Sequence, residues 1–286
     1  MIAPQESHVF NDEAANYAVV VGAGLRPIAE TPDGEMPVDA VVGAIQDPSD
    51  PHCPITSLVI VENCHAHTMS RPITPTYMRS LRAAVPSDIP IHVDGARLFN
   101  AAVALGVPVA DLVRDADSAT FCLSKGLATP VGSVVVGSGD FIWRARRARK
   151  LVGGGLRQVG ILAAAGLIAL DDGPDGTVAR LADDHRLARV LAEGLAAQDG
   201  IMSPGHLAQP HGTALDPERA TTNFVLFAVE GGQARRAAYL AALREQGVGM
   251  VAYPHGQIRA VTHLGIGDDE VARAIEASVR ALAATA

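Results

Sequence analysis

Residues 89–97 read IPIHVDGAR, a largely apolar run that ends in a carboxylate, Asp94, and is followed closely by Arg97. A short apolar run bounded by a glycine is typical of a buried β-strand. A helical pattern follows at residues 97–105, so the stretch predicts a strand that leads directly into a helix. Because open α/β sheets bind ligands at the carboxyl ends of their strands, we expect Asp94 and Arg97 to lie at a ligand site.

The alternation of strand-like and helix-like segments continues on both sides of this stretch. It predicts strands at residues 57–62, 118–123 and 132–137 and helices at residues 75–85, 139–151 and 156–171. Strands separated by helices indicate βαβ units, so we predict an α/β fold with a mostly parallel central sheet and helices on both faces. Residues 2–4 look like the interior of a strand, and we therefore expect further sequence upstream of them.

The segment DDGPDG, residues 171–176, is the clearest break in the chain because it combines acids, glycines and a proline. We place a domain boundary there, between a large domain at residues 1–171 and a smaller α+β domain at residues 172–286. In the smaller domain we predict helices at residues 177–198, 232–246 and 268–285 and strands at residues 222–228, 248–252 and 257–262. The last helix should place four apolar side chains on one face, those of Val271, Ile275, Val279 and Leu282.

The composition is typical of a protein with a large aliphatic core. Of the 286 residues, 48% are apolar and 19% are charged, which excludes a disordered chain. The formal net charge is −8, so no excess of basic residues is available to bind a phosphate backbone. We therefore expect no nucleic-acid partner.

The cysteines and the apolar segments indicate in which cellular compartment the protein works. Cys53, Cys64 and Cys122 form no CxxC pair and cannot build a disulfide framework, which indicates a reducing cytoplasm. The N-terminal residues lack the features of a signal peptide. The longest apolar run, residues 159–170, is shorter than the roughly 20 residues of a membrane span, so we expect a buried helix there and no membrane partner.

Lys125 is the only charged residue in the stretch 118–139, and it directly follows a predicted buried strand. We expect it to be largely desolvated. Burial lowers the pKa of an ammonium group, and a neutral amine is what chemistry with a carbonyl cofactor requires. The alternative is a lysine with a buried stem whose charged head reaches water.

Asp94 strengthens the first reading of Lys125. A carboxylate at a strand end can face the pyridinium nitrogen of pyridoxal phosphate and so support its action as an electron sink. The structural alternatives are a helix N-cap for Asp94 and a surface or ion-pair role for Arg97. With Lys125 about thirty residues further along the chain, we favour a cofactor site.

Three longer strings carry a resemblance to a known family: HVDGARLFNAAVALGVPVADL at residues 92–112, ADSATFCLSKGL at residues 116–127, and RKLVGGGLRQVGILAAAGLIAL at residues 149–170. They resemble the low-specificity L-threonine aldolases. These enzymes belong to the aldolase and β-eliminating lyase group of pyridoxal-phosphate enzymes, which have the aspartate-aminotransferase fold, fold type I. The similarity extends over essentially the whole chain from residue 5. It implies cleavage of L-threonine, L-allo-threonine or related β-hydroxy amino acids to glycine and an aldehyde.

The resemblance implies a role for each matching residue. Lys125 would bind the cofactor covalently, and Asp94 would pair with its pyridine nitrogen. Arg97 would lie near the cofactor and the substrate carboxylate. Arg259, in IRAVTH, would bind that carboxylate through its forked donors.

Further roles fall on two histidines and two basic residues. His8 would stack on the cofactor ring, and His65 would lie near the substrate hydroxyl. Lys150 and Arg157 flank the glycines at 153–155 and would reach the cofactor phosphate, in the site of a partner subunit. The resemblance therefore implies a homodimer or homotetramer with shared active sites.

The sequence also departs from the family. The usual region ahead of ESHVF, with a phosphate-binding loop at a helix start, is absent, so we expect either a misassigned start or a shortened protein. Asp12 stands where the family has a tyrosine. These departures leave open β-elimination on another amino acid, or a truncated inactive homologue. A metal site is a fourth alternative, built from Cys64, His65, His67 and His92, although no known zinc spacing is matched.

Overall fold

The computed structural model describes residues 1–170, 173 and 176–285. The chain forms two compact units, the first made of residues 1–66 and 72–179 and the second of residues 67–71 and 180–286. The predicted boundary between residues 171 and 172 lies outside the described residues. Each unit is described below by itself.

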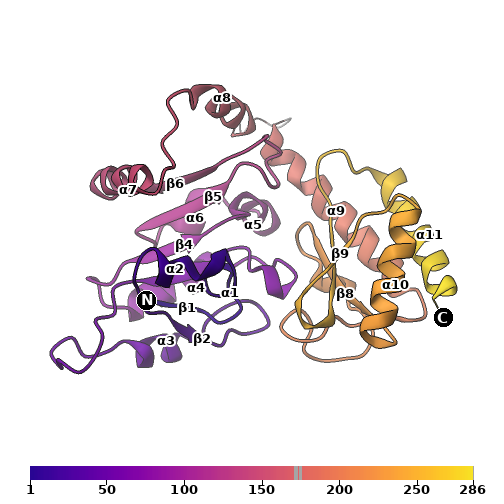
Figure 1. Cartoon of the computed structure of the whole chain (residues 1–286), viewed down its shortest axis with the longest axis horizontal. Helices are drawn as coiled ribbons and strands as arrows, with labels where there is room; N and C mark the ends of the chain where they lie inside the picture. The colour runs from indigo at the N-terminus through magenta and orange to yellow at the C-terminus, as the bar shows by residue number, and fades with distance from the viewer. Residues whose placement is uncertain (171–172, 174–175, 286) are drawn as a thin grey trace. The chain divides into compact units, whose positions relative to one another are not determined.

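The first unit is built on a six-stranded sheet, whose strands can be followed in Figure 1. The strands lie in the order β2-β1-β3-β4-β5-β6. They are β1 (Ile2–Pro4), β2 (Arg26–Ile28), β3 (Val59–Glu62), β4 (Ile91–Asp94), β5 (Ser118–Cys122) and β6 (Ser133–Gly137). All neighbours are parallel except β5 and β6, which pair antiparallel. The predicted mostly parallel sheet is confirmed, and residues 2–4 are part of it.

The register of the sheet aligns its polar and apolar positions. Val59 pairs with Ile91 and Val61 with Val93, and these four side chains are buried. Because side chains alternate along a strand, the intervening positions of β3 and β4 face the opposite side of the sheet. That side carries the polar residues from which the site is built.

Short helices connect and cover the strands. In the first unit they are α1 (His8–Asn11), α2 (Asn16–Val19), α3 (Val38–Ala44), α4 (Pro75–Ala84), α5 (Leu98–Leu105), α6 (Val109–Val113), α7 (Gly139–Leu151) and α8 (Gly160–Ala169). Helix α4 begins as the sequence predicts, with Pro75 in its first turn and the Thr74 side chain accepting a hydrogen bond from the Tyr77 N–H. Helix α7 lies next to the edge strand β6 (Figure 1).

Helix α8 differs from its prediction. The apolar run at 159–170 was expected to be a buried helix, but Ile161, Leu167 and Ile168 are 79%, 75% and 74% exposed. Only Gly166 and Ala169 of this helix are buried. The prediction that this helix is buried is therefore wrong for the single chain. The run is apolar on every side, and one chain covers only one side of it.

The second unit contains a four-stranded antiparallel sheet and three long helices. Its strands are β7 (Ile201–Met202), β8 (Phe224–Val229), β9 (Val251–Ala252) and β10 (Ile258–Val261), in the order β7-β8-β10-β9. Its helices are α9 (Thr177–Ala196), whose first turn precedes the division between the units, α10 (Gly232–Glu245) and α11 (Asp268–Ala284). Among the described residues, none of the helices of either unit combines the length and the apolar character that crossing a bilayer requires.

One detail of α11 corrects the predicted face. Val271 and Leu282 are buried, but Val279 is 53% exposed. Ser278 is buried in its stead, and its hydroxyl is 2.7 Å from the Tyr239 hydroxyl of α10. The apolar periodicity predicted that Val279 would be buried on this face. In the structure, the position is taken by Ser278 and its hydroxyl partner.

Candidate functional site

The carboxyl ends of three neighbouring parallel strands place polar side chains in one row. Glu62 of β3 pairs in register with Asp94 of β4, and Asp94 pairs with Thr120 of β5. The Thr120 hydroxyl donates to Asp94 Oδ1 at 3.5 Å. Two residues earlier on both strands, His92 Nδ1 lies 2.8 Å from Ser118 Oγ. Burial lowers the pKa of His92, although the charge of Asp94 partly opposes this shift.

The motif around Asp94 depends on Gly95. The Gly95 N–H donates to the Thr120 carbonyl oxygen at 2.9 Å, and a Cβ at Gly95 would lie 2.7 Å from that oxygen. Only glycine allows the chain to leave β4 so close to β5. Arg97 then stands at the N-cap of α5, so Asp94 and Arg97 emerge together as predicted.

Lys125 follows β5 in a tight turn. The Ala128 N–H donates to the Lys125 carbonyl oxygen at 3.0 Å, and the Thr129 N–H donates to the carbonyl oxygen of Leu123. Leu123 and Leu127 fill the buried positions of this turn, so the Lys125 side chain is exposed. The prediction that Lys125 is largely desolvated is therefore wrong for this chain, and its head reaches water as in the alternative reading.

The two predicted site histidines of the first unit lie after β1 and β3. The His8 N–H donates to Glu62 Oε2 at 2.6 Å, and its ring forms a half-exposed ion pair with Glu13 at 3.3 Å. His65 is fully buried, with Nε2 at 3.0 Å from Glu30 Oε1. The carboxyl ends of β1, β3, β4 and β5 thus carry His8, His65, Asp94 and Lys125 along one edge of the sheet.

Glu30 and Glu62 are polar residues that the sequence reasoning did not single out. Both are buried and both accept backbone N–H groups of loops. Glu62 ends the apolar string VIVE just as Asp94 ends IHVD, so the same pattern could have identified it. Glu30 follows the exposed strand β2 and has no such local signal.

Lys150 and Arg157 lie outside this edge. Lys150 is in the last turn of α7, Arg157 is in the segment between α7 and α8, and both side chains are exposed. Their predicted contact with a cofactor phosphate stays a prediction.

Arg259 belongs to the second unit, where it lies on β10. Its guanidinium carbon is 5.3 Å from the centre of the Phe224 ring and 5.0 Å from that of Tyr253. This aromatic sandwich fixes a forked donor on a short strand, which suits the predicted binding of a carboxylate.

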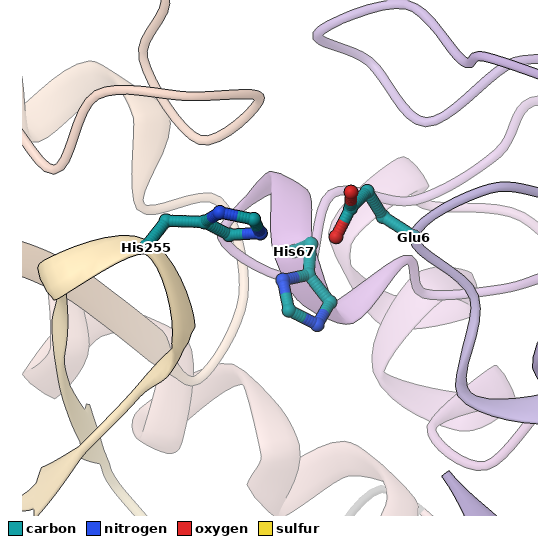
Figure 2. Close-up of side chains that lie close together, drawn as sticks. All are labelled: Glu6, His67 and His255. Carbon is teal, nitrogen blue, oxygen red and sulfur yellow. The ribbon is translucent and has the colours of Figure 1, made fainter. Parts of the chain in front are cut away.

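A histidine cluster of the second unit adjoins Tyr253. The ring of His67 stacks on Tyr253 at 4.9 Å and meets the ring of His255 edge to face at 5.8 Å, and His255 stacks on His206 at 3.8 Å. Figure 2 shows His67 and His255 side by side; Glu6, also labelled, belongs to the first unit.

The residues of the alternative metal site have different neighbours. His65 faces Glu30, His92 faces Ser118, and the Cys64 thiol donates to the Arg97 carbonyl oxygen at 3.5 Å. Each of these three side chains thus has a separate environment within the first unit.

Comparison with known proteins identifies the family. The beta-eliminating lyase family matches residues 1–216. Low-specificity L-threonine aldolase 1 of Arabidopsis thaliana is 36% identical over 274 residues, 95% of this chain and 72% of that protein. The low specificity L-threonine aldolase of Escherichia coli K12 is 37% identical over 272 residues, 95% of this chain and 74% of that protein.

The fraction of its own length over which a relative aligns with this chain differs from one relative to another. Probable low-specificity L-threonine aldolase 2 of Arabidopsis thaliana is 44% identical over 197 residues, 68% of this chain, and that alignment spans 54% of the relative's length. This chain therefore spans about half of that relative and about three quarters of the other two.

Solved structures confirm the predicted fold. A threonine aldolase of Leishmania major superposes with a TM-score of 0.73 at 19% identity, covering 98% of this chain and 77% of that one. A serine palmitoyltransferase of Sphingomonas wittichii superposes with a TM-score of 0.67 at 17% identity, covering 99% and 66%. With the shared fold and the sequence identity together, the chain belongs to the low-specificity L-threonine aldolase family of pyridoxal-phosphate-dependent beta-eliminating lyases.

Proposed function

We propose that this chain is an aldehyde-lyase that uses pyridoxal phosphate to cleave the Cα–Cβ bond of L-threonine, L-allo-threonine or related β-hydroxy-α-amino acids. The products would be glycine and an aldehyde. The observation that carries the proposal is the edge of the sheet at which His8, His65, Asp94 and Lys125 follow four parallel strands. The resemblance to the family to which the chain belongs implies a site role for each of these residues.

The donor set of this edge suits the cofactor. Asp94 is a half-buried carboxylate supported by Thr120 and would pair with the pyridine nitrogen, and Lys125 offers an amine on a fixed turn. When bound, pyridoxal phosphate supplies an electron sink for the charge left at Cα. Lys150 and Arg157 are the basic residues proposed for its phosphate.

The remaining residues would bind the amino acid and move its proton. Arg97 and Arg259 are proposed to hold the carboxylate, and the aromatic rings beside Arg259 keep its guanidinium oriented. His65, or a water that it orients, would take the proton of the β-hydroxyl, assisted by His8. Loss of this proton drives formation of the aldehyde carbonyl.

The first experiment is the absorbance spectrum of the chain with added pyridoxal phosphate, followed by borohydride reduction and peptide mapping. The chain has two lysines, Lys125 and Lys150, so the site of attachment is readily assigned. We expect a visible band and attachment at Lys125, with both lost in Lys125→Arg. A control for the N-terminal amine is needed because burial lowers its pKa and favours its reactive neutral form.

Product analysis then separates the reactions. Glycine and an aldehyde in equal amounts support the proposal, whereas ammonia and a 2-oxo acid indicate β-elimination. The second reaction is favoured by Asp12, which brings a negative charge where the family has a tyrosine. A chain that binds the cofactor but releases no product from any β-hydroxy amino acid would contradict the proposed lyase activity.

The exposed apolar surface of α7 and α8 supports a homodimer or homotetramer with shared active sites. It includes Trp143, Leu151, Ile161, Leu167 and Ile168, each at least 59% exposed. Exposed large apolar side chains on neighbouring segments are typical of an interaction surface, and an identical chain offers the same side chains. Light scattering should give the mass of an oligomer for the parent and for Val279→Glu on α11, and a smaller mass for Ile168→Glu.

The cytoplasm is the proposed location. No disulfide bond joins Cys53, Cys64 or Cys122 within the described residues, which fits a reducing compartment. The substrate would be a free amino acid rather than a macromolecule.

A further inference from the structure

Two buried carboxylates connect the segment after β1 with the segment after β3. Glu30 accepts the N–H groups of Gln5 at 3.0 Å and Glu6 at 2.8 Å, and it also pairs with His65. Glu62 accepts the N–H groups of His8 at 2.6 Å and Ala66 at 2.9 Å. We call Glu30 and Glu62 the carboxylate clamp. Each of its members holds both of the segments that carry a proposed site histidine.

His65 and its partner in the clamp, Glu30, are both buried. The side chains of His65 and Glu30 are 0% and 1% exposed. Gly34, with φ of +85°, packs against the ring, and a Cβ there would lie 2.7 Å from the Cβ of His65. The ring therefore has one well-defined position, with Nε2 directed at Glu30 and Nδ1 on the opposite side of the ring.

The charges that shift the pKa of His65 are those of carboxylates. Burial alone would lower the pKa of His65, but the charges of Glu62, Glu30 and Glu6 and the hydrogen bond to Glu30 together raise it. For Glu30, burial alone would raise the pKa, but His65 and the accepted N–H groups together lower it. A charged ring at this position would compensate the charge of the buried carboxylate that it faces.

We infer that Glu30 is a positioning residue of the proposed reaction, which fixes the orientation of His65 and keeps its ring as an imidazolium. This inference rests on the proposed function and refines it. An imidazolium carries protons on both nitrogens, so Nδ1 donates a hydrogen bond and does not accept a proton. His65 would then orient the water that takes the hydroxyl proton, and the ring itself would not be the base.

The test compares Glu30→Gln, which keeps the size but removes the charge, with Glu30→Asp, which keeps the charge. Glu35→Gln is the matched control, because it makes the same chemical change five residues away, and the charge of Glu35 is not among those that shift the pKa of His65. Ring nitrogen chemical shifts in ¹⁵N-histidine-labelled protein report protonation directly, and His65→Gln assigns the His65 signal among the ten histidines.

We expect the His65 ring to remain doubly protonated at pH 7.5 in the cofactor-loaded parent, in Glu30→Asp and in Glu35→Gln, and to be neutral in Glu30→Gln. In active protein, Glu30→Gln should lower kcat by about tenfold or more and shift its pH profile, with Glu30→Asp restoring most of the rate.

A neutral His65 ring in the parent at pH 7.5, or an unchanged ring in a folded Glu30→Gln variant, would overturn the inference. The parent measurement decides the matter even if Glu30→Gln does not fold. Ring protonation is measured without turnover, so absence of lyase activity would contradict the proposed function separately from this assignment.

Discussion

Strand β4 and helix α8 both carry large aliphatic side chains, but these side chains have opposite environments. In β4, Ile91 and Val93 are fully buried, whereas in α8 Leu167 and Ile168 are 75% and 74% exposed. The strand has neighbours on both sides within the same chain, because β3 and β5 pair with it. The helix lies beyond the sheet edge, where this chain covers only part of its surface. Apolar sequence therefore predicts that a segment is covered, but not by which molecule.

The largest effect on activity is expected from a change at Asp94, the carboxylate at the end of β4. Asp94→Asn should lower kcat at least about 100-fold, because an amide cannot balance a positive ring nitrogen. The fold should be retained, since within the described part of the chain the Asp94 carboxylate accepts a single, long hydrogen bond, from Thr120. Steady-state kinetics with cofactor in excess, together with urea unfolding, would measure both effects.

Asp117→Asn is the control at the opposite end of the same strands. Asp117 accepts hydrogen bonds from the Ile91 N–H and from Arg82, so its loss should reduce stability rather than kcat. Equal losses of activity in Asp94→Asn and Asp117→Asn would contradict the proposal that the site lies at the carboxyl ends of the strands.

The next effect tests the close approach of β4 and β5. Gly95→Ala should lower the free energy of unfolding by about 1–3 kcal/mol, because its Cβ would meet the Thr120 carbonyl oxygen at 2.7 Å. Gly139→Ala, at the start of α7 with nothing within 4 Å, should leave it unchanged or slightly higher. Urea denaturation of both variants measures the difference, and a Gly95→Ala protein as stable as the parent contradicts the packing described.

A smaller effect concerns His92, the half-buried histidine of β4. Burial lowers the pKa of His92 in the folded chain below its unfolded value of about 6.5, so folding favours the neutral ring. Its contribution to stability is complete above pH 6.5 and is lost as the pH falls below that value.

The free energy of unfolding should therefore decrease more between pH 7.5 and pH 5.5 in the parent than in His92→Gln. His52→Gln, at a side chain 92% exposed, should keep the parent's dependence. If His92→Gln also kept it, burial of His92 would not govern this part of the pH response.

The smallest effect is expected on α8 itself. Leu167→Ala should change the stability of the monomeric chain by less than about 0.5 kcal/mol, because the side chain is 75% exposed. The same change at the fully buried Leu81 of α4 should cost about 2–5 kcal/mol. Both are measured by denaturation at protein concentrations low enough for monomers, and a large loss at Leu167 would contradict the exposure of α8.

Local sequence was sufficient to predict most of the elements. The strands that end in Asp94 and Cys122, and the helix that begins at Pro75, lie within two or three residues of their predicted positions. The strand order and the polar row follow from register between segments about thirty residues apart, which no local pattern encodes. For the same reason the partner of His65, Glu30, could not be predicted from the sequence.

The exposure of Lys125 shows the second limit. Its sequence neighbours are uncharged, but the turn after β5 assigns the buried places to Leu123 and Leu127. Composition around a residue therefore predicts the environment of its backbone better than that of a long side chain.

The carboxylate clamp has a consequence for local motion. The N–H groups of Gln5, Glu6, His8 and Ala66 lie at or beyond the ends of strands, where amide protons usually exchange rapidly with solvent. Here each one donates to a carboxylate that is buried. Deuterium should therefore enter these four positions on the slow timescale of the sheet, and the loops that carry the two site histidines should open only when the sheet itself does.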